Sequence, residues 1–225
     1  MHVSTKLVDV QTRTFNQPET MIQALAQVCY ALDNNMITDV VIKDKNISLF
    51  RWTNEDGVIK MYGEDDCKIG NVFGTSDNCI LHGVNCLGVM GAGIAAQIKR
   101  RFPIAFHEYN KMVHLHKTAG IPLIGRAQFV EVMMGHFIVN AFTQEKTANY
   151  SGEKVISYSA ILNSLMLTAQ ECVERGITGI SMPKIGSDLG GGDWSIIRSI
   201  INAVFESVGV KVTVYVLPKE YLKQA

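Results

Sequence analysis

The chain has 225 residues, 47% of them hydrophobic and 19% charged, a composition typical of a globular protein with one large or two small domains. Its 21 basic residues (Lys and Arg) balance 21 acidic ones (Asp and Glu), so the formal net charge is zero. Proteins that hold nucleic acid or an anionic membrane through bulk charge carry clustered Lys and Arg, and this composition argues against both. An anionic ligand would have to be bound by something other than net charge.

The N-terminus and the cysteines favour a cytoplasmic protein. The first residues, MHVSTKLVDVQTRTF, carry charges and lack the continuous apolar core of a secretion signal. The longest apolar stretch, 127–142, is interrupted by Glu131 and His136 and falls short of the roughly 20 residues that a membrane span needs. The five cysteines are odd in number and have no C-x-x-C spacing, which favours reduced thiols over a zinc or redox site. We therefore expect no metal site and no membrane partner.

Residues 1–62 have the pattern of a small α+β unit. After Pro18, apolar residues from Ile22 to Leu32 recur at steps of three and four, which predicts an amphipathic helix that ends near Asn34. Three short apolar segments then follow with turn residues between them, as in successive antiparallel strands: 40–42, 47–52 and 58–62. The sequence gives no indication of what this unit does.

The pattern changes near Cys67, where strand-like apolar runs begin to alternate with helical ones. Strands are predicted near 67–72, 79–84, 128–133, 136–142, 177–181 and 211–217. Helices are predicted at about 93–102, 154–175 and 194–207, the first of them stopped by Pro103. Because adjacent strands mix with crossover helices, we expect residues 63–225 to form an α/β domain, a three-layer αβα sandwich with a mixed central sheet.

Eight of the 19 glycines lie in two short segments. The first holds Gly83, Gly88, Gly91 and Gly93, and the second holds Gly186, Gly190, Gly191 and Gly192. Each segment follows a predicted strand and precedes a predicted helix, where backbone N–H groups and the helix dipole attract anions. One such segment could serve only as a tight turn, but two at strand ends favour a clamp for a diphosphate. We therefore expect a nucleotide-like ligand.

Two common nucleotide motifs fit the sequence less well. Residues 91–96, GAGIAA, match the G-x-G-x-x-A form of a dinucleotide fingerprint. However, residues 85–90 separate this motif from its strand, and the acidic residue that should end a second strand is lacking. The G-x-x-x-x-G-K-[ST] pattern of a P-loop does not occur in the sequence, so a P-loop is excluded.

Several motifs resemble those of macrodomains, in the same order and spacing, over about residues 65–218. They are GNVF at 70–73, HGVNCLGVMGAGIA at 82–95, NAFTQ at 140–144, SMPKIG at 181–186 and the loop through Asp193 and Trp194. They are most similar to the branch that holds the ADP-ribose 1''-phosphate phosphatases and the terminal ADP-ribose glycohydrolases. The resemblance implies that residues 63–225 form a macrodomain with a pocket for ADP-ribose or a derivative, and no cofactor.

The resemblance also implies ligand contacts for individual residues. Asn71 stands where the family usually has Asp, and its amide oxygen would accept a hydrogen bond from the adenine amino group. Asn85 would contact the distal ribose, although an Asn in such a turn could equally serve the backbone. The other implied contacts are Val72, Phe73, Tyr215 and Leu217 at the base, Gly88, Met90, Gly91, Ala92, Gly93 and Ile94 at the distal ribose, and Lys184, Ile185, Gly186, Ser187, Asp188, Leu189 and Gly190 at the diphosphate. Phe73 and Tyr215 could equally be ordinary core residues.

Two positions depart from the glycohydrolases of this family. Gln144 stands where they have a catalytic Lys and Gly190 where they have an Asp, and neither can act as a nucleophilic amine or a carboxylate base. The departures favour hydrolysis of ADP-ribose 1''-phosphate to ADP-ribose and phosphate. Candidate catalytic residues are His82, Asn85, Gln144 and Asp188. A strand histidine such as His82 is more often a core residue, and Asp193 is expected to cap the following helix.

Two alternatives stay open. A non-catalytic module, such as a sponge for ADP-ribose-derived signals, needs the same pocket and no chemistry. An ADP-ribosyl hydrolase would instead act on modified protein or nucleic acid. The zero net charge makes nucleic acid an unexpected partner.

Overall fold

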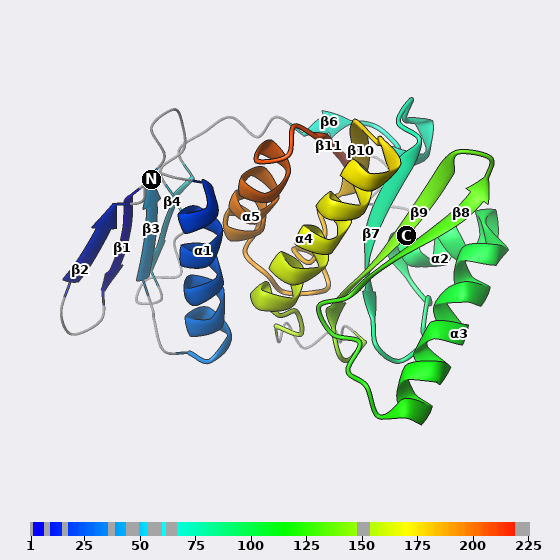
Figure 1. Cartoon of the computed structure of the whole chain (residues 1–225), viewed down its shortest axis with the longest axis horizontal. Helices are drawn as coiled ribbons and strands as arrows, with labels where there is room; N and C mark the ends of the chain where they lie inside the picture. Colours follow the sequence, from blue (N-terminus) through cyan, green and yellow to red (C-terminus); the bar gives the residue numbers. More distant parts are fainter. Residues whose placement is uncertain are drawn as a thin grey trace.

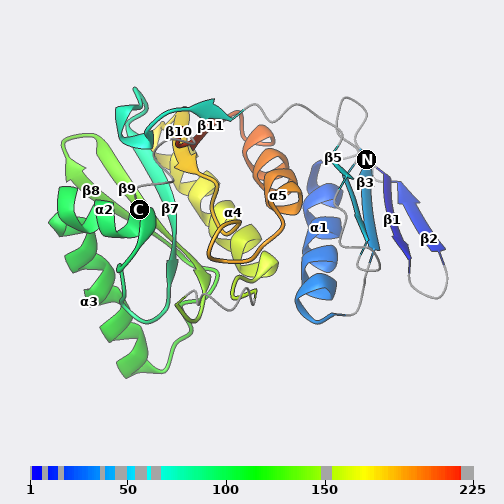
Figure 2. The ribbon, with the colours of Figure 1, turned by 180° about the vertical axis from the view of Figure 1, so that it is seen from behind.

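The computed structural model describes residues 2–6, 10–14, 18–35, 39–43, 50–53, 60–61, 67–147 and 154–218. These residues form two β-sheets with helices between and beside them, seen in Figure 1 and from behind in Figure 2. Within the described part of the chain, no helix combines the length and the apolar character that crossing a membrane requires.

The first unit is an antiparallel sheet with one helix. Its strands lie in the order β2-β1-β3-β4-β5. They are β1 (His2–Lys6), β2 (Val10–Thr14), β3 (Asp39–Lys43), β4 (Phe50–Thr53) and β5 (Lys60–Met61). Helix α1 (Pro18–Asp33) agrees with the predicted helix, whereas β1 and β2 were not predicted. The predicted boundary after residue 62 lies outside the described residues and stays a prediction.

The second sheet has six strands in the order β6-β11-β10-β7-β9-β8. They are β6 (Lys68–Ile69), β7 (Cys79–Asn85), β8 (Ala127–Met133), β9 (His136–Gln144), β10 (Gly179–Pro183) and β11 (Lys211–Val216). Neighbouring strands are parallel except β8, which forms an antiparallel hairpin with β9. The expected mixed sheet is therefore confirmed, and its parallel strands end at one common edge.

Helices cover both faces of this sheet, which confirms the three-layer sandwich (Figure 1). On one face lie α2 (Gly93–Arg101) and α3 (Pro103–Ala119), and on the other lie α4 (Tyr158–Arg175) and α5 (Trp194–Glu206). Helix α1 lies against α4 and α5 on their far side, between them and the small sheet (Figures 1 and 2). The α1 residues Leu25, Val28, Cys29 and Leu32 belong to the same buried cluster as the cores of α4 and α5.

Three local predictions differ from the structure. Pro103 does end α2, but it also begins α3, because at the first helical position its missing N–H has no partner to lose. Helix α4 begins at residue 158 rather than 154, since the Ser157 hydroxyl caps it by accepting from the Ala160 N–H at 3.0 Å. The strand predicted at 67–72 is short, and a 3₁₀ turn, η1 (Val72–Gly74), follows it.

Candidate functional site

The two glycine segments lie side by side at the edge where the parallel strands end. The first glycine loop (86–92) follows β7 and leads into α2. The second glycine loop (184–193) follows β10 and leads into α5. Because β7 and β10 are neighbouring parallel strands, both loops leave the sheet in the same direction. This is the position at which open α/β sheets bind ligands.

The side chain of Asn85 organises the first glycine loop. Its Oδ1 accepts from the N–H groups of Leu87 at 2.9 Å and Val89 at 3.3 Å, and its Nδ2 donates to the Val89 carbonyl at 2.7 Å. The amide is 8% exposed and its polar atoms are bonded within the loop. This geometry supports the backbone role that we weighed for Asn85 against a contact with the distal ribose.

Tyr109 of α3 is a site residue that the sequence reasoning missed. Its hydroxyl lies 2.8 Å from the Asn85 carbonyl and 2.9 Å from Asn85 Oδ1, and it accepts from the Gly88 N–H at 3.1 Å. The residue is fully buried, and burial raises the pKa of the Tyr109 hydroxyl. It was missed because α3 itself was not predicted, although Ala105, Tyr109 and Val113 follow a four-residue step on one buried face.

Two features shape the remainder of the first glycine loop: a close contact at Gly88 and the uncapped N-terminus of α2. Gly88 has φ of +79°, and a Cβ there would lie 2.6 Å from Asn110 Oδ1. Met90 is buried, whereas Gly91, Ala92 and Gly93 are exposed and Ile94 is half-buried. Ala92 makes no side-chain cap at the start of α2. Uncapped N–H groups at a helix N-terminus are suited to an anion.

The second glycine loop is too tightly folded for side chains at three of its glycines. Gly186 has φ of +71°. A Cβ on Gly190 would lie 2.6 Å from the Gly186 carbonyl oxygen and 2.7 Å from Ile156 Cγ2, and one on Gly192 would lie 2.8 Å from the same oxygen. That oxygen also accepts from the Gly192 N–H at 2.8 Å. Gly190 is therefore required by packing, and a carboxylate at this position would not fit the observed loop.

Residues 154–158, which we call the strap, join this loop to β9. The N–H groups of Val155 and Ile156 donate to the Gly190 carbonyl at 3.0 and 3.4 Å, and the Ser157 N–H donates to the Thr143 carbonyl at 3.1 Å. At the end of the strap, the Tyr158 hydroxyl accepts from the Asp193 N–H at 2.9 Å. The strap thus holds the C-terminal half of the second glycine loop, at Gly190 and at Asp193.

The other residues of the second glycine loop differ in their exposure to solvent. The Ser187 hydroxyl donates to the Lys184 carbonyl at 3.3 Å, and Lys184 Nζ lies 5.3 Å from the centre of the Trp194 ring. Asp188 and Leu189 are exposed, whereas Ile185 is buried. Among the four catalytic candidates, Asp188 is the exposed one, a carboxylate accessible to solvent.

Gln144 and His82 use their side chains within the fold. Gln144 Nε2 donates to the Lys146 carbonyl at 2.7 Å. His82 is fully buried in β7, with its Nε2 2.7 Å from Asn140 Oδ1, and burial lowers the pKa of His82 to about 4. Asn140 in turn donates to Gln128 Oε1 at 3.0 Å, so a polar row crosses three strands inside the sheet. This position supports the structural role of His82.

Asp193 caps α5, as expected. Its Oδ1 accepts from the Ser195 N–H at 2.7 Å and from the Ser195 hydroxyl at 2.6 Å. A carboxylate at this helix end is also stabilised by the helix dipole.

The residues expected at the base lie together near β6 and β11. Asn71 Oδ1 accepts from the Phe73 N–H at 3.0 Å and so caps η1, while the Asn71 side chain stays exposed. Val72, Phe73 and Tyr215 pack in one cluster. Lys68 Nζ lies 5.2 Å from the centre of the Tyr215 ring. Leu217, just past β11, is exposed.

A family model settles which fold family this arrangement represents. The model described as "Macro domain" matches residues 81–201, more than half of the chain. The chain belongs to the macro domain family. The matched residues run from β7 into α5 and include both glycine loops.

Proteins with similar sequences and structures agree with this assignment to the macrodomains. Human ADP-ribose glycohydrolase OARD1 is 27% identical over 128 residues, which are 57% of this chain and 74% of the relative. A DNA ADP-ribosyl glycohydrolase of Mycobacterium tuberculosis is 28% identical over 142 residues, 62% of this chain but 38% of that longer protein. The solved macrodomain of Mycobacterium tuberculosis DarG matches with a TM-score of 0.56 and 25% identity, covering 66% of this chain and 95% of that one.

The comparisons confirm the macrodomain but not the finer branch. Both relatives above are named as glycohydrolases, so the narrower resemblance to ADP-ribose 1''-phosphate phosphatases has no support from them. The name of the mycobacterial relative includes DNA, so the expectation that nucleic acid is not a partner is unsupported as well.

Proposed function

We propose that this macrodomain binds the ADP-ribose part of its substrate along its two glycine loops and removes by hydrolysis a group attached at the 1'' position of the distal ribose. The observation that carries the proposal is the position of both loops at one sheet edge, with the first loop leading into the uncapped N-terminus of α2. Backbone N–H groups and helix N-termini hold a diphosphate without positively charged side chains. A chain of zero net charge can therefore bind this anion.

The phosphate monoester of ADP-ribose 1''-phosphate is the substrate that best suits the residues present. Gln144 and Gly190 leave the site without the amine and carboxylate of a lysine-dependent deacylation. Attack of water on phosphorus needs instead an oriented water and donors for the phosphoryl oxygens. We assign the orientation of this water to the exposed carboxylate of Asp188. A bond between phosphorus and the water oxygen forms and the bond between phosphorus and the 1''-oxygen breaks. Asp188 takes the water proton, and the departing 1''-oxygen, which stays on C1'', is protonated by solvent.

A second candidate is the removal of ADP-ribose from a modified protein or nucleic acid. The names of the glycohydrolase relatives favour it. Without Lys at position 144 or Asp at 190, this reaction would also depend on a water that Asp188 orients. A module that binds ADP-ribose without turnover needs neither Asp188 nor an oriented water.

Calorimetric titration with ADP-ribose, followed by turnover assays, tests the proposal. Three substrates are compared: ADP-ribose 1''-phosphate, an ADP-ribosylated oligonucleotide and an ADP-ribosylated peptide. We expect saturable binding, phosphate release from the first substrate, and loss of release in Asp188→Asn with binding retained.

The controls separate binding from chemistry. Gly186→Val should weaken binding, because a side chain there would meet Ile197 and Ile161 in a left-handed backbone conformation. Gly74→Ala is the matched control, since no other atom lies within 4 Å of its Cβ position. Absence of saturable binding overturns the whole proposal, and binding without turnover on any substrate leaves the non-catalytic module.

A further inference from the structure

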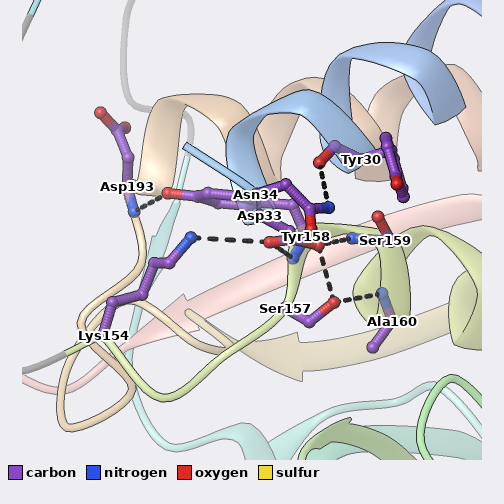
Figure 3. Close-up of polar contacts among 9 residues, drawn as sticks. All are labelled: Tyr30, Asp33, Asn34, Lys154, Ser157, Tyr158, Ser159, Ala160 and Asp193. Carbon is purple, nitrogen blue, oxygen red and sulfur yellow. Dashed lines mark hydrogen bonds and ion pairs between the residues drawn. The ribbon is translucent and has the colours of Figure 1, made fainter. Parts of the chain in front are cut away.

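The C-terminal end of α1 reaches the start of α4, where Asp33 makes several polar contacts (Figure 3). Its Oδ1 accepts from the Tyr158 N–H at 2.9 Å, and its Oδ2 accepts from the Ser159 N–H at 2.9 Å and the Ser157 hydroxyl at 2.8 Å. Lys154 Nζ lies 3.5 Å from Oδ1. The Asp33 side chain is 16% exposed, so these contacts are shielded from solvent.

Asp33 thereby completes the cap of a helix in another part of the chain. The Ser157 hydroxyl serves the Ala160 N–H, and Asp33 serves the two preceding N–H groups of α4. A negative charge at this end also suits the α4 dipole. These amides would have no partner in this arrangement if the carboxylate were removed.

Asp33 contacts the same segment that holds the second glycine loop, and Tyr158 takes part in both sets of contacts. Lys154, Ser157 and Tyr158 all belong to the strap. The strap donates two N–H groups to the Gly190 carbonyl, and its Tyr158 hydroxyl accepts from the Asp193 N–H. Lys154 Nζ, which is paired with Asp33 in Figure 3, also lies 4.6 Å from the centre of the Tyr158 ring. A continuous chain of contacts therefore runs from α1 to the C-terminal half of the loop, at Gly190 and Asp193.

Apolar packing fixes where Asp33 stands. Leu25, Val28, Cys29 and Leu32 of α1 are buried in the cluster that contains the inner faces of α4 and α5. The pKa of Cys29 is raised to about 12 by burial and by the nearby charge of Asp33. The Asp33 carboxylate is thus held in place by a well-packed helix rather than by an exposed loop.

We infer that Asp33 is a positioning residue for the second glycine loop, and that the first unit, through α1, is part of the ligand site. This inference rests on the proposed function for its ligand, ADP-ribose. Asp33 does not contact the ligand in this scheme. It holds the strap, and the strap is hydrogen-bonded to Gly190 and Asp193 of the loop along which the diphosphate would lie. Misplacement of binding groups by about 1 Å is enough to weaken a preorganised site.

The experiment measures loop order and ligand affinity separately in the full chain. Amide hydrogen exchange without ligand is followed in peptides covering 184–193 and, as an internal reference, 86–92. We expect Asp33→Ala to speed exchange in the second glycine loop and not in the first, and to weaken ADP-ribose binding about 2- to 30-fold. Asp33→Asn, which keeps one acceptor oxygen but no charge, should give an intermediate effect in both measurements.

Two controls separate positioning from general loss of stability. Asn34→Ala removes a side-chain hydrogen bond to the Tyr30 carbonyl beside Asp33 but leaves the strap intact, and it should match wild type. Val130→Ala removes buried methyl groups from β8, far from the strap, and should lower stability without a selective effect on 184–193. If Asp33→Ala does not fold, Tyr158→Phe tests the last link of the chain, because it removes only the acceptor for the Asp193 N–H.

The outcomes are distinguishable. Faster exchange confined to 184–193 in the Asp33 variants supports the inference, even if wild type fails to bind ADP-ribose and the proposed function falls. Unchanged exchange in 184–193, or equal acceleration in both loops as for Val130→Ala, overturns it. Wild-type affinity for ADP-ribose in a variant with a loosened loop also overturns the claim that the first unit contributes to the site.

Discussion

Replacing Gly190 by Ala tests whether the second glycine loop tolerates any side chain at that position. The new Cβ would lie 2.6 Å from the Gly186 carbonyl oxygen, a backbone atom that also accepts the Gly192 N–H. Overpacking of this kind costs about 1–3 kcal/mol, and loss of the Gly192 bond adds about 1 kcal/mol. For a chain of this size, a loss of about 2–4 kcal/mol lowers the Tm by roughly 4–16 °C. ADP-ribose affinity should fall too, because relief requires the loop backbone to move.

The second close contact, with Ile156 Cγ2 at 2.7 Å, provides an internal test. Thermal unfolding and ADP-ribose titration are measured for Gly190→Ala, Ile156→Ala and the double variant, with Gly74→Ala as control. Removing Ile156 should relieve only part of the Gly190→Ala penalty in the double-mutant cycle, since the clash with the carbonyl of Gly186 remains. Wild-type Tm and affinity in Gly190→Ala, or complete relief in the double variant, would refute the reasoning.

Two further predictions concern the sheet and the first glycine loop. Tyr109→Phe leaves the part-buried Gly88 N–H and the Asn85 carbonyl without their shared partner, and it should lower the free energy of unfolding in urea by about 1–2 kcal/mol. An unchanged midpoint would contradict the network. The folded-state pKa of His82, about 4, lies below the ordinary value of 6.5. When the pH is lowered, the imidazole is therefore protonated in the unfolded chain before it is protonated in the folded protein. Protonation of His82 does not reduce the free energy of unfolding above about pH 6.5. As the pH falls from there to about 4, the free energy of unfolding decreases by about 3 kcal/mol. His82→Gln, which can still donate to Asn140, should show a shallower loss of stability over this range, and equal slopes would rule out His82 as the source.

The strands and the glycine loops could be predicted because their signals are local. A strand such as β7 or β9 is an apolar run between turn residues, and the glycines that shape each loop are neighbours in sequence. Helix α3 was missed because Pro103 was interpreted only as a stop. The four-residue step of Ala105, Tyr109 and Val113 was the signal that could have identified it.

The side-chain roles at the site could not be predicted in the same way. Whether Asn85 bonds a ribose or its own loop depends on how that loop closes, and both uses need the same residue type. The contact between Asp33 and Ser157 joins positions 124 residues apart, and nothing in either local segment indicates the other. The resemblance to macrodomains likewise implies that Gly190 stands where the glycohydrolases have a carboxylate, but it does not reveal that the loop has no room for one.

The buried cluster that joins α1 to α4 and α5 has a consequence for how the chain unfolds. Leu25 and Leu32 share one core with Ile161 and Ile197, so separating α1 from α4 and α5 would expose apolar surface on both sides at once. Domains with independent cores melt in separate transitions, whereas elements with a common core melt together. We therefore expect α1 to melt in the same cooperative transition as α4 and α5, so a calorimetric scan should contain no separate transition for this helix.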